Sequence, residues 1–360
     1  MNEQKIVLVG GGTAGSVMPL IAIYQKLRTQ KQKYTFLFLG TKNGIEKDIA
    51  LSEDIPFTAI ISGKFRRYFD VRNLIDPFKT IAGIFQSLYV LSKYKPEVVL
   101  SAGSFVATPV IWAAWLLGIP VIVHQLDIKK GLSNALTAPC ATHITVVLEE
   151  LKNFFPEFKT IWTGNPVRES LLHGDRERAI NRFGLRHDLP ILLVLGGGTG
   201  ALELNKIIAD SRRELTKFVQ IIHITGKDKK VVESEGNYHA YSFLKDDLKY
   251  AYAASDVVIS RAGMSTISEL AVLKKPLILV PLPHSHQLDN ASFFEKRNAC
   301  QVLKQEELSV STITKAVKKY LVDTEYKRKV TDHLAGLFRS DSLECYIKLI
   351  QRTIKENHEE

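Results

Sequence analysis

A short apolar run that leads directly into a glycine-rich turn occurs twice in this chain, and it restricts the fold more than any other feature. Residues 6–9 precede the turn at residues 10–15, and residues 191–195 precede the turn at residues 196–201. A helical pattern follows each turn, so each run begins a unit of strand, turn and helix that is typical of a parallel sheet. The repeat predicts two Rossmann-like domains in one chain.

Further short runs of β-branched residues alternate with helical patterns. We expect strands at residues 6–9, 35–39, 57–61, 98–100, 121–124 and 145–147, and again at residues 191–195, 221–224, 257–259, 277–280 and 301–303. The predicted domains are residues 1–163 and 164–339, and an amphipathic helix at about residues 340–360 is predicted to pack back on the first domain. Because open parallel sheets bind ligands beyond the carboxyl ends of their strands, we expect the ligand site in a cleft between the domains.

The composition is that of a globular protein with an excess of positive charge. Hydrophobic residues make up 45% of the chain, and 48 Lys and Arg residues against 38 Asp and Glu residues give a net charge of +10. This excess favours an anionic partner, and composition leaves open whether it is nucleic acid, a phosphorylated substrate or an acidic membrane surface. The three cysteines form no metal-ligand or disulfide pattern, so we expect a reducing, cytoplasmic compartment.

Two segments bear on membrane insertion. The N-terminus leads directly into the first strand, so no signal peptide is expected. Residues 105–123 carry no charge and are long enough to suggest a membrane-spanning helix. Pro109, Gly118 and Pro120 interrupt this segment, and they favour a buried helix, a turn and a buried strand instead.

The first turn has glycines at positions 10, 12 and 15, which match the G-x-G-x-x-G fingerprint of dinucleotide-binding folds. Such turns let the backbone and the N–H groups of a helix N-terminus approach phosphates. A dehydrogenase would also need an acidic residue at the end of the second strand, which here reads Leu39-Gly40-Thr41-Lys42. The missing carboxylate disfavours NAD, although Lys42 could suit NADP. Alternatively, the glycines only allow a helix to pack on a strand.

A series of motifs follows along nearly the whole chain, at residues 11–19, 117–121, 131–134, 164–168, 196–201, 261–269 and 286–291. In this order they resemble the MurG family of N-acetylglucosaminyltransferases of peptidoglycan synthesis. The most specific are Gly-Asn-Pro-Val-Arg at residues 164–168 and Gly-x-x-Thr-x-Ser-Glu at residues 263–269.

This resemblance implies a GT-B fold and an inverting transfer without a metal or other cofactor. The donor would be UDP-N-acetylglucosamine. The acceptor would be a muramyl peptide on undecaprenyl diphosphate (lipid I, which becomes lipid II) at the cytoplasmic face of the membrane, and no nucleic-acid partner is implied. No Asp-x-Asp pair accompanies the glycine turns, so Arg168 and helix N-termini would neutralise the leaving UDP.

Transferred by motif, the resemblance places most donor contacts in the second domain. Glu269 would accept the ribose hydroxyls, and Arg168 would meet the diphosphate. The other substrate-binding residues that it implies are Thr13, Gly15, Asn134, Gly198, Thr199, Leu244, Met264, Ser265, Thr266, Gln287 and Asn290, of which Gln287 and Asn290 would meet the sugar and Leu244 the uracil. Arg168 could instead form a surface or interdomain ion pair, and Glu269 could be an ordinary acid in the first turns of a helix.

The motifs of the first domain depart from the family pattern. The family's Gly-Thr-Gly-Gly-His becomes Gly-Thr-Ala-Gly-Ser at residues 12–16, and its Gly-Gly-Tyr-Val-Ser becomes Gly-Ser-Phe-Val-Ala at residues 103–107. The family's His-Glu-Gln-Asn becomes His-Gln-Leu-Asp at residues 124–127. The donor side therefore matches the family better than the acceptor side.

These departures determine the catalytic candidates. Ser16 replaces the family's histidine and cannot act as a base. Asp127 is the candidate base, because it follows a buried strand at its carboxyl end, and His124 is the alternative. Asp127 could instead cap the next helix.

A basic and aromatic segment suggests membrane contact. Residues 64–69 read Lys-Phe-Arg-Arg-Tyr-Phe, and Ile81, Ile84, Phe85, Leu88 and Tyr89 follow at helical spacing. This pattern suits the interface of an anionic bilayer. It also suits a core-facing helix behind a solvated basic turn.

Other functions remain open at this point. They are another GT-B transferase acting on a diacylglycerol or polyprenyl lipid, a UDP-N-acetylglucosamine 2-epimerase, which would not need a basic-aromatic surface, an NAD(P) oxidoreductase, and a degenerate UDP-sugar-binding subunit without catalysis.

Overall fold

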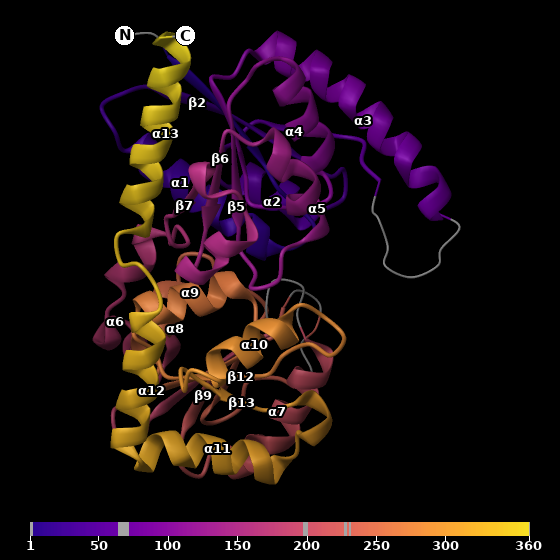
Figure 1. The fold of residues 1–360 in the computed structure, drawn as a ribbon. Helices are drawn as coiled ribbons and strands as arrows, with labels where there is room; N and C mark the ends of the chain where they lie inside the picture. Colours follow the sequence, from indigo (N-terminus) through magenta and orange to yellow (C-terminus); the bar gives the residue numbers. More distant parts are fainter. Residues whose placement is uncertain (1–2, 64–71, 197–200, 227–228, 230–231, 360) are drawn as a thin grey trace. The chain divides into compact units, whose positions relative to one another are not determined.

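The computed structural model describes residues 3–63, 72–196, 201–226, 229 and 232–359, which form two compact units (Figure 1). Unit 1 is Met1–Arg168 with Arg339–Glu360, and unit 2 is Glu169–Phe338. Each unit is built on its own parallel sheet.

Unit 1 contains a sheet of order β3-β2-β1-β4-β5-β6-β7. Its strands are β1 (Gln4–Val9), β2 (Tyr34–Gly40), β3 (Phe57–Ala59), β4 (Val98–Ser101), β5 (Val121–Gln125), β6 (His143–Val146) and β7 (Thr160–Trp162). Its helices are α1 (Met18–Arg28), α2 (Ile45–Ser52), α3 (Arg72–Tyr94), α4 (Ala107–Leu116), α5 (Leu132–Thr137) and α13 (Ser342–Glu359). Short 3₁₀ helices span Ala14–Ser16, Ala138–Cys140, Glu149–Phe154 and Glu157–Lys159.

Unit 2 contains a sheet of order β10-β9-β8-β11-β12-β13. Its strands are β8 (Ile191–Leu195), β9 (Gln220–Ile224), β10 (Tyr238–Tyr241), β11 (Val257–Ser260), β12 (Leu277–Leu279) and β13 (Gln301–Val302). Its helices are α6 (Arg176–Phe183), α7 (Leu202–Leu215), α8 (Leu248–Ala254), α9 (Met264–Val272), α10 (Gln287–Glu295), α11 (Val310–Val322) and α12 (Thr324–Gly336), with 3₁₀ helices at Glu169–His173 and Gln305–Glu307.

The strand order determines where each unit can bind a ligand. In unit 1 the order reverses between β1 and β4, and in unit 2 it reverses between β8 and β11. The loops that follow these strand pairs diverge, and the space between them is the usual ligand position in an open parallel sheet. The first glycine turn predicted from the sequence follows β1 and lies at such a point. The second follows β8 in the sequence, and its residues 197–200 lie outside the described residues.

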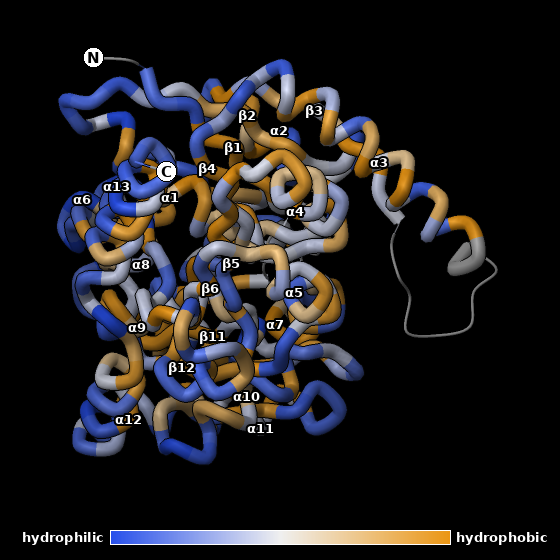
Figure 2. Tube along the Cα trace, turned by 45° about the horizontal axis from the view of Figure 1, so that its top comes forward, coloured by the Kyte–Doolittle hydropathy of each residue, from blue (hydrophilic) through white to orange (hydrophobic). Residues whose placement is uncertain are grey.

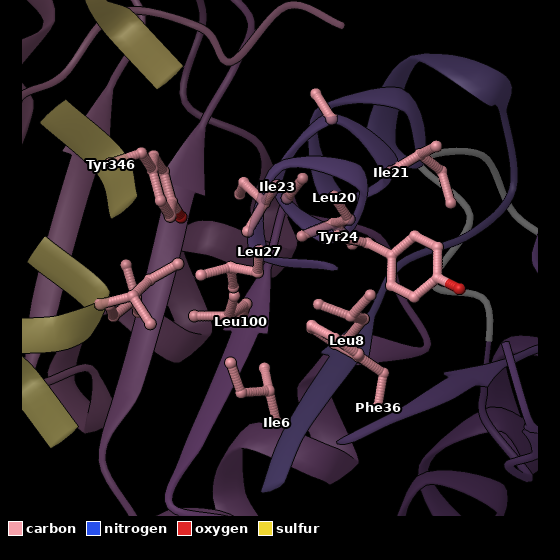
Figure 3. Close-up of a cluster of buried hydrophobic side chains, with 14 of the residues drawn as sticks. Ile6, Leu8, Leu20, Ile21, Ile23, Tyr24, Leu27, Phe36, Leu100 and Tyr346 are labelled. Atoms are coloured by element: carbon pink, nitrogen blue, oxygen red, sulfur yellow. The ribbon is translucent and has the colours of Figure 1, made fainter. Parts of the chain in front are cut away.

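The core of unit 1 joins distant parts of the chain. Alternate residues of β1, Ile6 and Leu8, pack against α1 residues such as Leu20, and Tyr346 and Ile350 of α13 complete the same cluster (Figure 3). The C-terminal helix is therefore a part of this hydrophobic core.

The uncharged segment at residues 105–123 forms α4, a turn and the buried strand β5, as predicted. The turn depends on Gly118, whose φ of +69° is favourable for glycine. Among the described residues, no helix has the length and apolar character that crossing a membrane requires.

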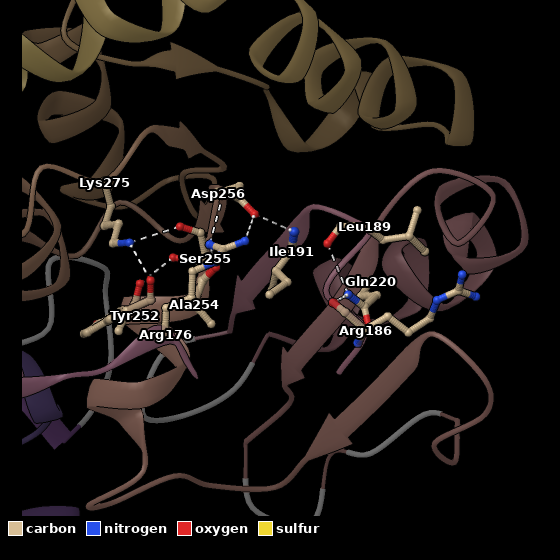
Figure 4. A network of polar contacts seen from close by, with 11 residues as sticks. Arg176, Arg186, Leu189, Ile191, Gln220, Tyr252, Ala254, Ser255, Asp256 and Lys275 are labelled. Carbon is tan, nitrogen blue, oxygen red and sulfur yellow. Dashed lines mark hydrogen bonds and ion pairs between the residues drawn. The ribbon is translucent and has the colours of Figure 1, made fainter. Parts of the chain in front are cut away.

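A polar network joins the amino ends of the strands in unit 2 (Figure 4). Arg176 forms two hydrogen bonds to the carboxylate of Asp256, which also accepts one from the backbone N–H of Ile191 at 2.9 Å. Lys275 donates to two backbone carbonyl groups, and burial lowers the pKa of its amine to about 8. Since Ile191 begins β8 and Asp256 precedes β11, these contacts stabilise the amino ends of two inner strands of the sheet.

Candidate functional site

In unit 2, the first turn of α9 offers backbone N–H groups next to the end of β11. Gly263 caps this helix without a side-chain hydrogen bond, and a Cβ atom at Gly263 would meet nothing within 4 Å. The backbone N–H groups of Met264, Ser265 and Thr266 belong to the first turn of this helix, where the helix itself supplies no acceptors. The space at Gly263 lets an anionic group approach this helix end. The predicted residues Gly198 and Thr199, in the turn after β8, lie outside the described residues.

Glu269 lies one turn further along α9 and contacts α8. Its carboxylate is buried, and its Oε2 accepts a hydrogen bond of 2.7 Å from the hydroxyl of Tyr252 in α8. A carboxylate has lone pairs for several donors, and this bond orients Glu269. Tyr252 was not among the predicted site residues, because a contact between two helices leaves no local pattern in the sequence.

The turn from β11 to α9 is braced by Arg261 and Asn290. The guanidinium of Arg261 is buried and donates to the carbonyl oxygens of Val280 and Pro281 and to Oε1 of Gln305. Burial lowers the pKa of Arg261. Arg261 therefore positions the turn, a role that the sequence motif did not assign to it.

Asn290 is fully buried, and its Nδ2 donates to the carbonyl oxygen of Ala262 at 3.0 Å. This bond holds the turn, and the expected contact of Asn290 with the sugar stays a prediction. Gln287, at the start of α10, is half-buried, and its Oε1 accepts a hydrogen bond from the backbone N–H of Leu282. Leu244 is buried just after β10, beside the exposed Phe243.

A pocket of about 660 Å³ opens between α7, the loop before α10 and the segment at residues 304–308. Its size is within the usual range for small-molecule sites. Its lining residues are Glu203, Lys206, Ile207, Asp210, Pro281, Pro283, His284, Leu288, Lys304, Gln305, Glu306 and Leu308. Of the predicted binding residues that the structure describes, none lines this pocket, although Gln305 connects it to Arg261.

In unit 1, the hydroxyl of Ser16 stabilises the first glycine turn. Its Oγ donates to the carbonyl oxygen of Gly11 at 2.9 Å and lies 3.2 Å from that of Thr13. Gly12 has a φ of +83°, which only glycine adopts without strain, and Thr13 is exposed while Gly15 is half-buried. Ser16 therefore shapes the turn and is not placed as a base.

The loop after β5 contains the candidate base. Asp127 lies in a bend two residues beyond β5 and is half-buried. The helix that follows, α5, is capped by Gly131, so the alternative in which Asp127 caps this helix is wrong. Gln125 donates to the carbonyl oxygens of Asp127 and Lys129 and thereby fixes the bend.

Asn134 secures the same loop from α5. Its Nδ2 donates to the carbonyl oxygen of His124 at 3.1 Å and to Oε1 of Gln125 at 2.9 Å. Its side chain is buried. Asn134 therefore stabilises the conformation of the loop that carries Asp127.

The structure does not support His124 as the base. Its imidazole is 1% exposed, bonds through Nδ1 to the hydroxyl of Thr145 and packs edge-on against Tyr346 of α13. Burial lowers its pKa to about 4. A histidine in this position is neutral and closed off from a substrate.

The loop after β4 carries a departure from the family motif that is visible in the backbone. Ser104 has a φ of +115°, a conformation that favours the glycine found there in the family. Its carbonyl oxygen accepts a hydrogen bond of 2.6 Å from Ser133 of α5. This contact holds the unusual conformation next to the β5 loop.

The Gly-Asn-Pro-Val-Arg motif ends at Arg168, the last residue of the first segment of unit 1. Gly164 has a φ of +75°, and a Cβ atom there would lie 2.8 Å from Cβ of Ser342. Ser342 donates to the carbonyl oxygen of Asn165 at 2.8 Å. The start of α13 therefore anchors the segment that leads to the half-buried Arg168.

The family of the chain follows from models that match both units. The glycosyltransferase family 28 N-terminal domain matches residues 6–146, and the glycosyltransferase family 28 C-terminal domain matches residues 191–343. The chain therefore belongs to glycosyltransferase family 28.

Relatives with a more specific name are similar to it over most of its length. The UDP-N-acetylglucosamine–N-acetylmuramyl-(pentapeptide) pyrophosphoryl-undecaprenol N-acetylglucosamine transferase of Clostridium kluyveri is 40% identical, over 88% of this chain and 91% of that protein. The protein of the same name from Clostridium tetani is 41% identical, over 85% of this chain and 87% of that protein. The predicted resemblance to the MurG family is confirmed.

Solved structures show the same fold at low sequence identity. MurG of Acinetobacter baumannii has a TM-score of 0.72 and 24% identity, covering 97% of this chain and 99% of that one. UDP-GlcNAc 2-epimerase of Neisseria meningitidis has a TM-score of 0.71 and 14% identity, covering 97% of this chain and 100% of that one. With the family assignment, these similarities confirm the predicted GT-B fold class.

Proposed function

We propose that this chain is an inverting transferase that moves N-acetylglucosamine from UDP-N-acetylglucosamine to a muramyl pentapeptide on undecaprenyl diphosphate. The observation that carries this proposal is identity of about 40% to transferases with that name over nearly nine-tenths of the chain. The similarity to these relatives spans both units, so it covers the donor-side and the acceptor-side domains.

On the donor side, the proposal uses the end of β11 and the start of α9. The first-turn N–H groups of α9 would receive a phosphate of UDP, and the oriented carboxylate of Glu269 would accept ribose hydroxyls. The fixed turn supports this use, because donors that are held in place need no rearrangement when UDP leaves. Arg168 would add a positive charge at the diphosphate.

A transfer assay tests the proposed function directly. We expect the full chain, given radiolabelled UDP-N-acetylglucosamine and lipid-linked muramyl pentapeptide in detergent, to release UDP in proportion to labelled lipid product. UDP-glucose and an acceptor-free mixture are the controls. Formation of UDP-N-acetylmannosamine without acceptor would identify an epimerase instead, and UDP binding without any product would identify a degenerate binding subunit.

Metal independence is a separate prediction. The diphosphate charge would be met by Arg168 and backbone N–H groups, so EDTA should leave the rate of transfer within about twofold of its value in buffer. The measurement compares initial rates with EDTA, with EDTA and excess Mg²⁺, and without additions. Loss of activity that Mg²⁺ or Mn²⁺ restores would contradict the prediction.

We also propose that α3 binds the surface of an anionic bilayer, at the cytoplasmic face where a lipid-linked acceptor would be found. On α3, the side chain of Phe78 is 72% exposed, that of Phe85 is 68% exposed and that of Tyr89 is 67% exposed. Figure 2 shows hydrophobic residues along the length of α3. The opposite side of α3 is packed, because a Cβ atom at Gly83 would overlap the carbonyl oxygen of Ile61. The core-facing alternative is therefore wrong for these aromatic residues.

Charge and the acceptor of the relatives both favour an acidic lipid surface as the partner of the exposed side of α3. The net charge of +10 favours an acidic surface, and the relatives are named for an undecaprenol-linked acceptor. Trp115 and Leu116, at the end of α4, add exposed apolar area, and α4 packs along α3. The basic segment at residues 64–69 lies outside the described residues.

Replacing both Phe78 and Phe85 by serine should weaken binding to phosphatidylglycerol vesicles by about a hundredfold or more, since each of the two buried aromatic rings contributes about 1.5–3 kcal/mol. Vesicle co-sedimentation measures this effect. Phe158→Ser is the matched control, because Phe158 is 87% exposed but lies outside α3. Equal binding of the double variant and the control would contradict the proposal.

A further inference from the structure

A buried carboxylate lies under the first glycine turn. Glu46, in the first turn of α2, has no exposed surface. Its Oε2 accepts a hydrogen bond of 3.2 Å from the backbone N–H of Gly12, and its Oε1 accepts one of 2.8 Å from the backbone N–H of Thr41. The hydroxyl of Thr41 also donates to Oε1. Glu46 thus joins the loop after β1 to the loop after β2.

Glycines make the space for this carboxylate. A Cβ atom added at Gly11, Gly40 or Gly44 would overlap the side chain of Glu46. Of these, Gly40 ends β2 and Gly44 caps α2. Glycines around a buried side chain, at the carboxyl ends of two adjacent strands, indicate a site built to hold that side chain.

The contacts fit the ionised form of Glu46. A carboxylate only accepts hydrogen bonds, and Gly12 and Thr41 donate to it. In nucleotide-binding glycine turns, a backbone N–H of this kind is directed at a ligand phosphate. Here Oε2 of Glu46 accepts the hydrogen bond from the backbone N–H of Gly12 and so takes the place of a phosphate oxygen.

We propose that Glu46 is a positioning residue for the acceptor. Its carboxylate replaces a ligand anion beneath the first glycine turn and thereby holds Gly12, Thr13 and Ser16 in the geometry that the acceptor needs. Gly12 carries the bond to Glu46, and Ser16 closes the same turn through Gly11 and Thr13. The acceptor role rests on the proposed function, whereas the effect on the turn does not.

Glu46→Gln tests this proposal with the smallest change in shape. One carboxylate oxygen becomes an NH₂ group that faces a backbone N–H donor, so one of the two loops must move. We expect kcat/KM for the lipid acceptor to fall at least about tenfold, with KM for UDP-N-acetylglucosamine within about twofold of the unmodified chain. Hydrogen exchange at residues 10–17 should become faster, and this readout requires no turnover.

Two further variants complete the experiment. Glu53→Gln makes the same change at the other end of α2, where the carboxylate bonds Gln25, and should leave both readouts unchanged. Gly44→Ala keeps the charge of Glu46 but places a methyl group against its carboxylate, so it should repeat the loss for the acceptor. This variant also serves if Glu46→Gln does not fold.

The outcomes separate the two proposals. If the unmodified chain transfers no sugar, the proposed function fails, and hydrogen exchange still tests the role of Glu46 in the turn. If Glu46→Gln lowers only the melting temperature, with unchanged acceptor kinetics, Glu46 is merely structural and the inference is overturned. Unchanged exchange at residues 10–17 would overturn it as well.

Discussion

Asp127→Asn is expected to lower the turnover of sugar transfer by about two orders of magnitude or more, with the affinity for UDP unchanged. Inverting transfer needs a group that accepts the proton of the acceptor hydroxyl while the new bond forms, and a positioned base typically contributes a factor of this size. Asparagine keeps the size of the side chain and removes its basicity. The loss should therefore appear in turnover and not in binding.

The contacts of His124 and Ser16 disfavour these two residues as the base, and the helix cap at Gly131 removes the capping alternative for Asp127. Gly131, and not Asp127, caps α5. His124 is buried with a pKa of about 4, and the hydroxyl of Ser16 is bonded within its own turn. Of the three catalytic candidates, only Asp127 combines a carboxylate with partial exposure at the carboxyl end of a central strand.

Turnover at saturating donor and acceptor, together with calorimetry of UDP binding, measures both parts of the prediction. Asp48→Asn is the matched control, because Asp48 is an exposed aspartate on α2 of the same unit. A near-normal turnover of Asp127→Asn would remove Asp127 from the mechanism. Loss of UDP affinity in this variant would show a structural defect instead.

The central strands of both sheets were predictable because they are buried on both faces and read as continuous apolar runs. The prediction at residues 191–195 coincides with β8, and that at residues 6–9 covers most of β1. The edge strands β7 and β10 were missed. β7 has only three residues, which is too short to show a periodic pattern. β10 reads Tyr-His-Ala-Tyr and has no aliphatic β-branched residue that would distinguish it from a loop.

The site was predictable as a set of motifs but not as a set of contacts. The order of the motifs identified the family, and the glycine turns identified the strand ends. The contacts of Arg261 with the loop after β12 and of Tyr252 with Glu269 join segments far apart in the sequence. The hydrogen bond from Asn290 to the carbonyl oxygen of Ala262 also joins distant segments, so the motif around Asn290 did not predict it.

Glu46 illustrates most clearly that contacts of the site could not be predicted from the sequence alone. The sequence lacks an acidic residue at the end of the second strand, and this absence argued against a dinucleotide. The structure places a carboxylate there from six residues further on, in contact with the first glycine turn. Gly40, Gly44 and Glu46 in close succession were the available signal, but only the fold brings them to Gly11.

Glu269→Ala is expected to weaken UDP binding by about 1.5–3 kcal/mol, which corresponds to about a 10- to 150-fold rise in Kd. Hydrogen bonds from ligand hydroxyls to a charged acceptor contribute this much, and the bond from Tyr252 already orients the carboxylate so that little freedom is lost on binding. The same variant leaves the buried hydroxyl of Tyr252 without this acceptor, so its stability should fall as well.

Two variants separate the effect on binding from the effect on stability. Glu269→Gln keeps an oxygen for Tyr252 and should retain the melting temperature, yet it should still bind UDP more weakly because it loses the charge. Glu295→Ala, an exposed glutamate at the end of α10, should change neither. Isothermal calorimetry with UDP and thermal unfolding of each variant provide the two measurements. If Glu269→Ala and Glu269→Gln bind UDP as tightly as the unmodified chain, Glu269 does not contact the nucleotide, and its role is confined to packing α9 against α8.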